Sequence, residues 1–399
     1  MLGVILAFAW FGVISAALLA CASIERRQRV PLCRDRPELA PRPALWGGGV
    51  EAPPAHHMLA RALAGAARIV RARTVVAERG RGLRFAARAV GCVALASALA
   101  LIPFAGAFGG VPGGAPLVVV DLHHGLVALV LLVLLAAMAQ IAVGLCESSP
   151  FARLACVRLA GRVLALAGTL AIVLAPIALA SGSLRLHAIV ADQQGSFAPF
   201  ALLAAFLASA DSGSGSGTVV TLLQRIHGPA WHVFRQPLTA LLFVLVLGLL
   251  TRRPLAVDPI GGSVRLSAFG HDDDPGELYW ARSEERLAAV LCAALFVALF
   301  LAAGSIPYLP TARLVAPLVP FFGEGLPAIL GGAVEIGIFF VKLTLTLACM
   351  ARVSRRMVSL RDDQWIRIVT RRILPLGWAN LLLVAGAVLM LAAARKGGG

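Results

Sequence analysis

Apolar runs of about twenty residues recur along the chain, and shorter polar segments separate them. A helix of that length crosses about 30 Å of hydrocarbon, because each residue adds about 1.5 Å to the helix axis. The pattern therefore predicts an all-α integral membrane protein with eight transmembrane helices. The predicted spans are residues 2–22, 87–107, 118–145, 159–181, 233–250, 287–304, 326–350 and 373–394.

Arginine alternates between successive polar segments. It is abundant in 23–86, 146–158, 251–286 and 351–372, whereas the segments between these carry little positive charge. Membrane proteins retain their basic loops in the cytoplasm. The alternation predicts a multi-pass protein of the bacterial inner membrane, with every other loop cytoplasmic and both termini periplasmic.

Two further segments have their own character within a single membrane domain of residues 1–394, which a short tail, 395–399, follows. The cytoplasmic loop 23–86 contains "HHMLARALAGAARIVRARTVV" (56–76), whose apolar and arginine faces predict an amphipathic helix on the membrane surface. An extra apolar segment, 197–210, is too short to span, and "DSGSGSG" follows it as a Gly/Ser linker. Residues 195–230 therefore resemble an insertion.

Composition agrees with a membrane protein. The chain has 399 residues, 59% of them hydrophobic and 14% charged, and a net charge of +16 that comes almost wholly from arginine. Such a charge also occurs in nucleic-acid-binding proteins, but in this setting topology accounts for it. Seven cysteines form no CxxC pair. The chain has no ligand set for an iron–sulfur cluster or haem, no metal-binding histidine spacing and no phosphate loop, so neither metal nor flavin is expected in it.

Two charged residues interrupt the seventh apolar run. Glu335 and Lys342 lie seven residues apart, two helical turns along one face, which is too far for a direct ion pair. Charged groups inside a bilayer are costly and usually face other helices or a water-filled path. Both residues are candidates for a proton path, and capping within the structure is the alternative for Glu335.

Several motifs, in chain order, are similar to one known family, a membrane subunit of respiratory complex I, the NADH–quinone oxidoreductase. "DQWIRIVTRRILPLGWAN" (363–380) resembles the DQ…LLPL…N segment that enters the last helix of this subunit. "WHVFRQPLTALLF" (231–243) resembles the family's WNxFxQPLaFliF. Weaker matches in the same order are "ERR" (25–27), "CRDRPE" (33–38), "LIPF" (101–104), "DLHHGLV" (121–127), "GLCESSPFARLACVR" (144–158), "GSLRLHAIVADQ" (182–193) and "RRP" (252–254).

This resemblance implies a subunit without a redox centre of its own, in a multisubunit enzyme that passes electrons from NADH to quinone. The subunit forms part of the quinone chamber below the peripheral arm, and its partners are quinone, lipid, the other membrane subunits and the peripheral quinone-site subunits. Nucleic acid is not among them. The residues that the resemblance assigns to the quinone chamber or a subunit interface are Glu25, Arg26, Arg34, Arg36, Trp231, Gln236, Arg253, Asp258, Arg361, Asp363 and Gln364.

The chain departs from the family where the family has membrane glutamates. The register gives Leu166 and Ala167, Leu250, and about Ala294 at those positions. Arg162 stands one turn after Arg158, where both are expected to snorkel to cytoplasmic headgroups or, alternatively, to line the quinone entrance.

Three alternative functions stay open. They are a degenerate structural paralogue without proton relay, the membrane subunit of a related hydrogenase complex, and a free-standing transporter, which the absence of a visible internal repeat disfavours.

Overall fold

The computed structural model describes residues 81–105, 117–146, 150–197, 228–250, 275–308, 313, 316–322, 325–356 and 362–397. The predicted first span (2–22), the amphipathic helix (56–76) and the apolar segment 197–210 lie outside these residues.

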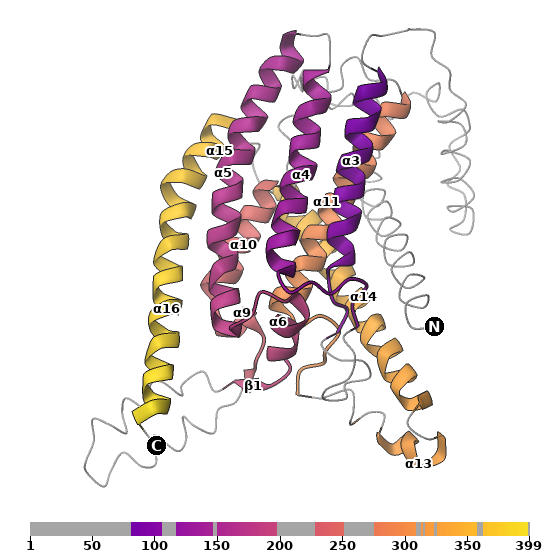
Figure 1. Cartoon of the computed structure of the whole chain (residues 1–399), viewed down its shortest axis with the longest axis vertical. Coiled ribbons are helices and arrows are strands. Elements are labelled where there is room, and N and C mark those ends of the chain that lie inside the picture. Colours follow the sequence, from indigo (N-terminus) through magenta and orange to yellow (C-terminus); the bar gives the residue numbers. More distant parts are fainter. Residues whose placement is uncertain are drawn as a thin grey trace.

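Long helices dominate the described part of the chain (Figure 1). They are α3 (Arg81–Ala100), α4 (Gly125–Leu145), α5 (Pro150–Ser181), α10 (Pro237–Leu250), α11 (Pro275–Phe300), α14 (Gly325–Arg356) and α16 (Leu374–Gly397). The shorter elements are α6 (Leu186–Asp192), β1 (Ser196–Phe197), β2 (Gly228–Pro229), α9 (His232–Arg235), the 3₁₀ helix η4 (Ala316–Leu318), α13 (Val319–Phe322), α15 (Asp362–Ile368) and the π-helix η5 (Val369–Ile373).

Five of the described helices are long and apolar enough to cross a membrane, and the chain is a multi-pass membrane protein. These five spans are Gly82–Ala100, Gly125–Leu145, Cys156–Ser181, Pro327–Val353 and Gln364–Met390. A shorter apolar helix covers Pro237–Val246. The predicted helical membrane fold is thus confirmed, whereas the count of eight spans stays a prediction.

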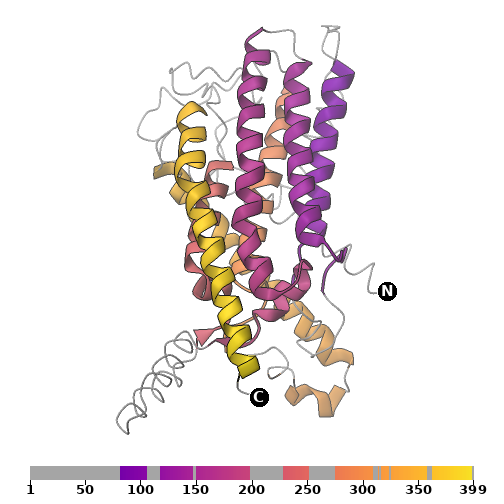
Figure 2. The ribbon, with the colours of Figure 1, turned by 60° about the vertical axis from the view of Figure 1, so that its left-hand side comes forward.

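The helices form two packed rows (Figures 1 and 2). One row runs α3, α4, α5, α16, and the other, behind it, contains α14, α11 and α10. Helices α3, α5, α11 and α15 begin at the same end of the bundle, where α4 and α14 also finish. We name this the basic end, because Arg84, Arg88, Arg153 and Arg158 lie there, and we name the opposite one the far end.

Several helix boundaries differ from those expected. Helices α5, α10 and α11 begin at Pro150, Pro237 and Pro275 rather than at 159, 233 and 287. Proline suits the first position of a helix, because its missing N–H has no partner there in any case. Charged residues that hydropathy assigns to loops therefore belong to the first turns of α5 and α11.

The connection between α3 and α4 is also shorter in helix than predicted. Helix α3 ends at Ala100 and α4 begins only at Gly125, whereas the predicted spans reach 107 and start at 118. The backbone of this connection pairs with itself instead: Phe104 N–H donates to the Leu117 carbonyl at 2.9 Å, and Val120 N–H donates to the Ala100 carbonyl at 3.2 Å. Pro103 cannot donate a helical hydrogen bond, so a helix is disfavoured there.

The two ends of the 195–230 segment lie side by side. Ser196 pairs with Pro229 and Phe197 with Gly228 in a short antiparallel ladder, and Ala230 N–H donates to the Gly195 carbonyl at 3.0 Å. The segment therefore leaves and rejoins the bundle at one place.

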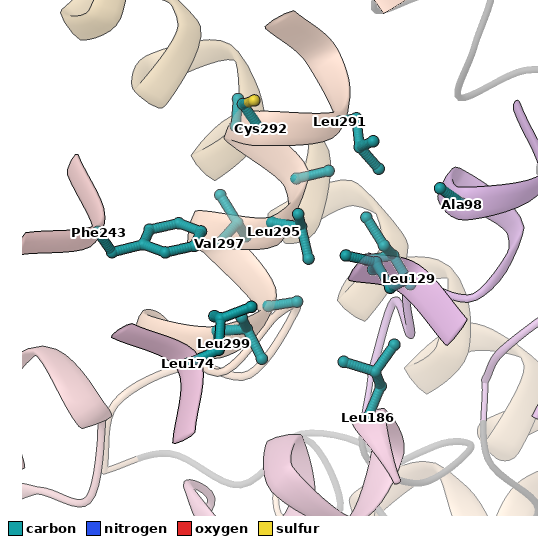
Figure 3. Packing of buried hydrophobic residues seen from close by; sticks show 14 of the residues in the cluster. Ala98, Leu129, Leu174, Leu186, Phe243, Leu291, Cys292, Leu295, Val297 and Leu299 are labelled. Atoms are coloured by element: carbon teal, nitrogen blue, oxygen red, sulfur yellow. The ribbon is translucent and has the colours of Figure 1, made fainter. Parts of the chain in front are cut away.

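The core lies between the two rows and centres on α11. Figure 3 shows Val297 and Leu299 of α11 facing Phe243 of α10, Leu174 of α5 and Leu129 of α4. These five side chains are at most 2% exposed. Rings stack at one edge of the core, where Phe243 and Phe300 have centroids 5.1 Å apart.

Candidate functional site

Lys342, in the middle of α14, points at the end of α11. Its ammonium donates three hydrogen bonds, to the carbonyls of Leu301 at 2.7 Å, Ala303 at 2.9 Å and Ser305 at 2.7 Å. The same nitrogen lies 4.4 Å from the centre of the Trp231 ring, within the range of a cation–π interaction. We name this group, Lys342 with the three carbonyls and the Trp231 ring, the lysine clasp.

The backbone at the end of α11 has a special conformation. Ala302 and Ala303 have φ of 53° and 48°, the left-handed region that alanine rarely adopts. Two left-handed residues in succession turn alternate carbonyls, those of 301, 303 and 305, toward Lys342. The turn costs about 1 kcal/mol or more per residue, so its surroundings must hold it in place.

Gly304 is required by the close approach of three segments. A Cβ at this position would lie 2.7 Å from the Glu335 carbonyl carbon and 2.8 Å from the Phe104 carbonyl oxygen. The Gly304 N–H donates to that same Phe104 carbonyl at 2.8 Å. Glycine therefore lets the end of α11 lie against the backbone of α14 and of the α3–α4 connection.

Gln193 supports the same turn from α6 and α9. Its side-chain Oε1 accepts the Ala302 N–H at 3.1 Å and the His232 N–H at 3.4 Å. Its Nε2 donates to the Ala298 carbonyl at 3.1 Å and the Ile189 carbonyl at 3.3 Å. The side chain is 1% exposed, so one buried amide joins three elements.

His232, next to Trp231, is completely buried. Among the described residues, neither of its ring nitrogens has a hydrogen-bond partner. Burial, reinforced by the nearby Arg235 and opposed by Asp192, lowers the pKa of His232 from 6.5 to about 4. The ring is therefore neutral at physiological pH.

Two predicted or motif residues form interior hydrogen bonds between helices. Gln236 donates from Nε2 to the Pro176 carbonyl of α5 at 3.2 Å. Asn380 of α16 donates to the Thr239 hydroxyl of α10 at 2.8 Å. All three polar side chains are buried, and these bonds tie α10 to the row of helices in front of it.

A second group of buried charges lies at the basic end, between α3 and α11. Arg84, Arg88 and Glu284 are 4%, 5% and 3% exposed. A Cβ on Gly91 of α3 would lie 3.2 Å from the Glu284 carboxyl carbon, so this glycine makes room for the carboxylate. Arg88 and Glu284 both act electrostatically on the nearby Cys92. We name Arg84, Arg88 and Glu284 the arginine cluster.

Arg162 of α5 is buried as well, at 7% exposed, with its guanidinium 5.1 Å from the centre of the Trp365 ring of α15. The expectation that Arg162 snorkels to lipid headgroups is wrong, because α15 folds over this part of α5 and covers it. Arg158, one turn earlier, is exposed, as snorkelling requires.

The predicted site residues do not gather in one place. Asp363 and Gln364 lie in α15 at the basic end, where Gln364 is exposed. Trp231 and Gln236 lie on the far side of the core, close to α9, and Glu335 is 1% exposed in α14. Glu25, Arg26, Arg34, Arg36, Arg253, Asp258 and Arg361 lie outside the described residues.

Sequence reasoning missed the arginine cluster and Gln193. It assigned Arg84 and Glu284 to loops, although Arg84 and Arg88 have the spacing of one helical turn and Pro275 marks an earlier start of α11. For Gln193 no local pattern distinguishes a buried amide from an exposed one.

These observations define the class: a polytopic helical membrane protein with buried charges at both ends of its core. Residues 57–214 match a family model described as NADH dehydrogenase, and the resemblance to that family is confirmed over this segment. The segment includes α3, α4, α5 and α6. The chain matches no curated protein.

Proposed function

We propose that this chain is the quinone-chamber subunit in the membrane part of a proton-translocating NADH–quinone oxidoreductase. In this proposal the basic end faces the cytoplasm of a bacterial cell below the peripheral arm, and both termini are periplasmic. The observation that carries the proposal is the NADH dehydrogenase match over residues 57–214.

The arginine cluster supports this proposal on physical grounds. Ionisable groups inside a membrane are expensive, at about 2.5–3.5 kcal/mol each even on insertion scales, and usually mark a polar path or a binding site. Arg84, Arg88 and Glu284 are buried at the end where loops rich in arginine predict the cytoplasm. In our proposal Glu284 takes the place of the membrane glutamates that the family has and this chain lacks.

The roles in this chamber follow from the chemistry of the groups. Electrons pass from NADH to quinone through the partner subunits, and quinone reduction consumes protons. Glu284 would hold or release one of them, while the neighbouring arginines stabilise its carboxylate form. Glu335, buried in α14, would continue the proton path toward the core. The predicted loop residues, Arg36 among them, would dock the peripheral arm.

Glu284→Gln is the sharpest test of the chamber role. NADH-driven quinone reduction in inverted membrane vesicles should fall by about tenfold or more, since the amide cannot carry a proton. The control is Glu285→Gln, which removes a carboxylate from the next position, a half-buried one. Assembly is checked first, by copurification of soluble partner subunits with the tagged chain. Unchanged turnover in an assembled Glu284→Gln complex would refute the chamber role, and a chain that purifies alone would refute the whole proposal.

A degenerate structural subunit is the second candidate, and one observation favours it. Leu166 and Ala294, which stand at family glutamate positions, are 4% and 1% exposed and belong to the apolar core. Those positions therefore lack any group that binds a proton. If Arg36→Glu, Glu284→Gln and Glu335→Gln all leave turnover unchanged in an assembled complex, this candidate replaces the first.

A further inference from the structure

The partners of Lys342 have the chemistry of a binding site for a monovalent cation. Three carbonyl oxygens at 2.7–2.9 Å and an aromatic face at 4.4 Å surround one nitrogen. Carbonyl dipoles and aromatic quadrupoles attract positive charge without carrying negative charge themselves. An ammonium or a potassium-sized ion suits such a set, and here the chain's own side chain occupies it.

The backbone shapes this site independently of the lysine. Ala302 and Ala303 turn the carbonyls inward, and Gln193 fixes the turn through the Ala302 N–H and the Ala298 carbonyl. The contact of Gly304 with the backbone of α14 holds it from the other side. The oxygens thus keep their places when the lysine side chain is shortened.

The hydrogen bonds of the clasp also select the charged form of the lysine. An ammonium has three donors, and three carbonyls accept them, whereas a neutral amine has only two. Amide carbonyls are too weakly basic to take a proton in turn. The clasp therefore does not suit a group that loses and regains a proton in each cycle.

We propose that the end of α11 is a monovalent-cation site that Lys342 fills in place of a free ion. Its role is to hold α14 and Trp231 to the left-handed turn, so Lys342 is a positioning residue rather than a proton carrier. The ligand class that replaces it is a primary ammonium ion or a potassium-sized cation. This inference does not depend on the quinone-chamber proposal.

The experiment measures thermal unfolding of the full-length chain in detergent, with whatever subunits copurify. Lys342→Ala empties the site and should lower Tm by several degrees. Methylammonium chloride should restore at least half of that loss, because its head donates three hydrogen bonds. Tetramethylammonium chloride, which has the same charge and no donor, should restore none of it.

Lys342→Met is the matched control. Methionine fills the space of the lysine stem and supplies no charge, so its Tm should also fall but should not respond to methylammonium. An unchanged Tm in Lys342→Ala would overturn the proposal. Equal recovery with both ammonium salts, or no recovery with either, would overturn it as well.

A second pair of variants keeps the proposal testable if Lys342→Ala does not accumulate. Trp231→Leu removes the aromatic face from the cation, and Trp231→Phe retains a weaker one. The Tm of the leucine variant should fall below that of the phenylalanine variant. Equal Tm values for the two would refute the contribution of the ring to the site.

Discussion

The lysine clasp and the arginine cluster both bury charge, but they stabilise it by different means. Backbone carbonyls and one aromatic ring surround Lys342, and none of these groups titrates. The arginine cluster instead brings a carboxylate together with guanidinium groups, and a carboxylate can bind a proton. The difference teaches that buried charge in one chain can serve two purposes: a fixed connection between helices, and a site where protonation changes.

Gly304→Ala should break the clasp side of the comparison with the largest effect. The added Cβ would overlap the Glu335 backbone and the Phe104 carbonyl, which cannot move as a flexible side chain can. We expect a loss of about 4 kcal/mol or more in stability, beyond the usual cost of overpacking, and loss of the folded chain from membranes. Immunoblotting and thermal unfolding measure this.

Gly337→Ala is the matched control, since a Cβ at this position of α14 meets nothing within 4 Å. It should be neutral or slightly stabilising. Normal accumulation and Tm for Gly304→Ala would contradict the close approach of α11 and α14.

His232 should give the clasp region a pH dependence in stability that Lys342 does not. The unfolded chain binds a proton at the ordinary pKa of 6.5, whereas the folded chain resists it until about 4. Stability is therefore complete above pH 6.5 and falls as pH drops toward 4, by at most about 3 kcal/mol. Thermal unfolding across this pH range measures the effect.

His232→Leu should flatten that dependence, because leucine fills the apolar site without titrating. His187→Gln is the control: this histidine lies beside Asp121 with its Nδ1 3.0 Å from the carboxylate, and its replacement should retain the fall. A His232→Leu profile parallel to wild type would assign the dependence to other groups.

Arg162→Gln should have the smallest effect and sharpens the arginine side of the comparison. It removes the cation from the Trp365 ring, for which a desolvated contact is worth about 2 kcal/mol. We expect a lower Tm and weaker packing of α15 against α5. Arg158→Gln, one turn away and exposed, should change Tm by less than about 0.5 kcal/mol of stability. Equal effects of the two would restore the snorkelling interpretation of Arg162.

Much of the fold was predictable, because spans are a matter of length and polarity. The apolar runs identified each described span to within a few residues at one end, as for 159–181 against α5, which ends at Ser181. The errors lie where helices continue beyond the apolar run into charged residues. Pro150, Pro237 and Pro275 mark the true starts, and hydropathy does not weigh them.

The candidate site was predictable only in part. Glu335 and Lys342 stood out, because charge inside an apolar run is rare. Their partners did not, since a carbonyl of Leu301 or Ala303 looks like any other carbonyl in a sequence. Trp231 was selected from a family motif for another role, and nothing local connected it with a lysine more than a hundred residues later.

The sequence by itself determined that this protein crosses a membrane repeatedly, which segments do so, and which family the motifs resemble. The physical reason is that the bilayer imposes its thickness and polarity on each segment separately. Only the tertiary structure decided which buried charges meet carbonyls and which meet other charges. That outcome depends on how α11 packs against α3 on one side and α14 on the other, and packing between distant segments leaves no local pattern.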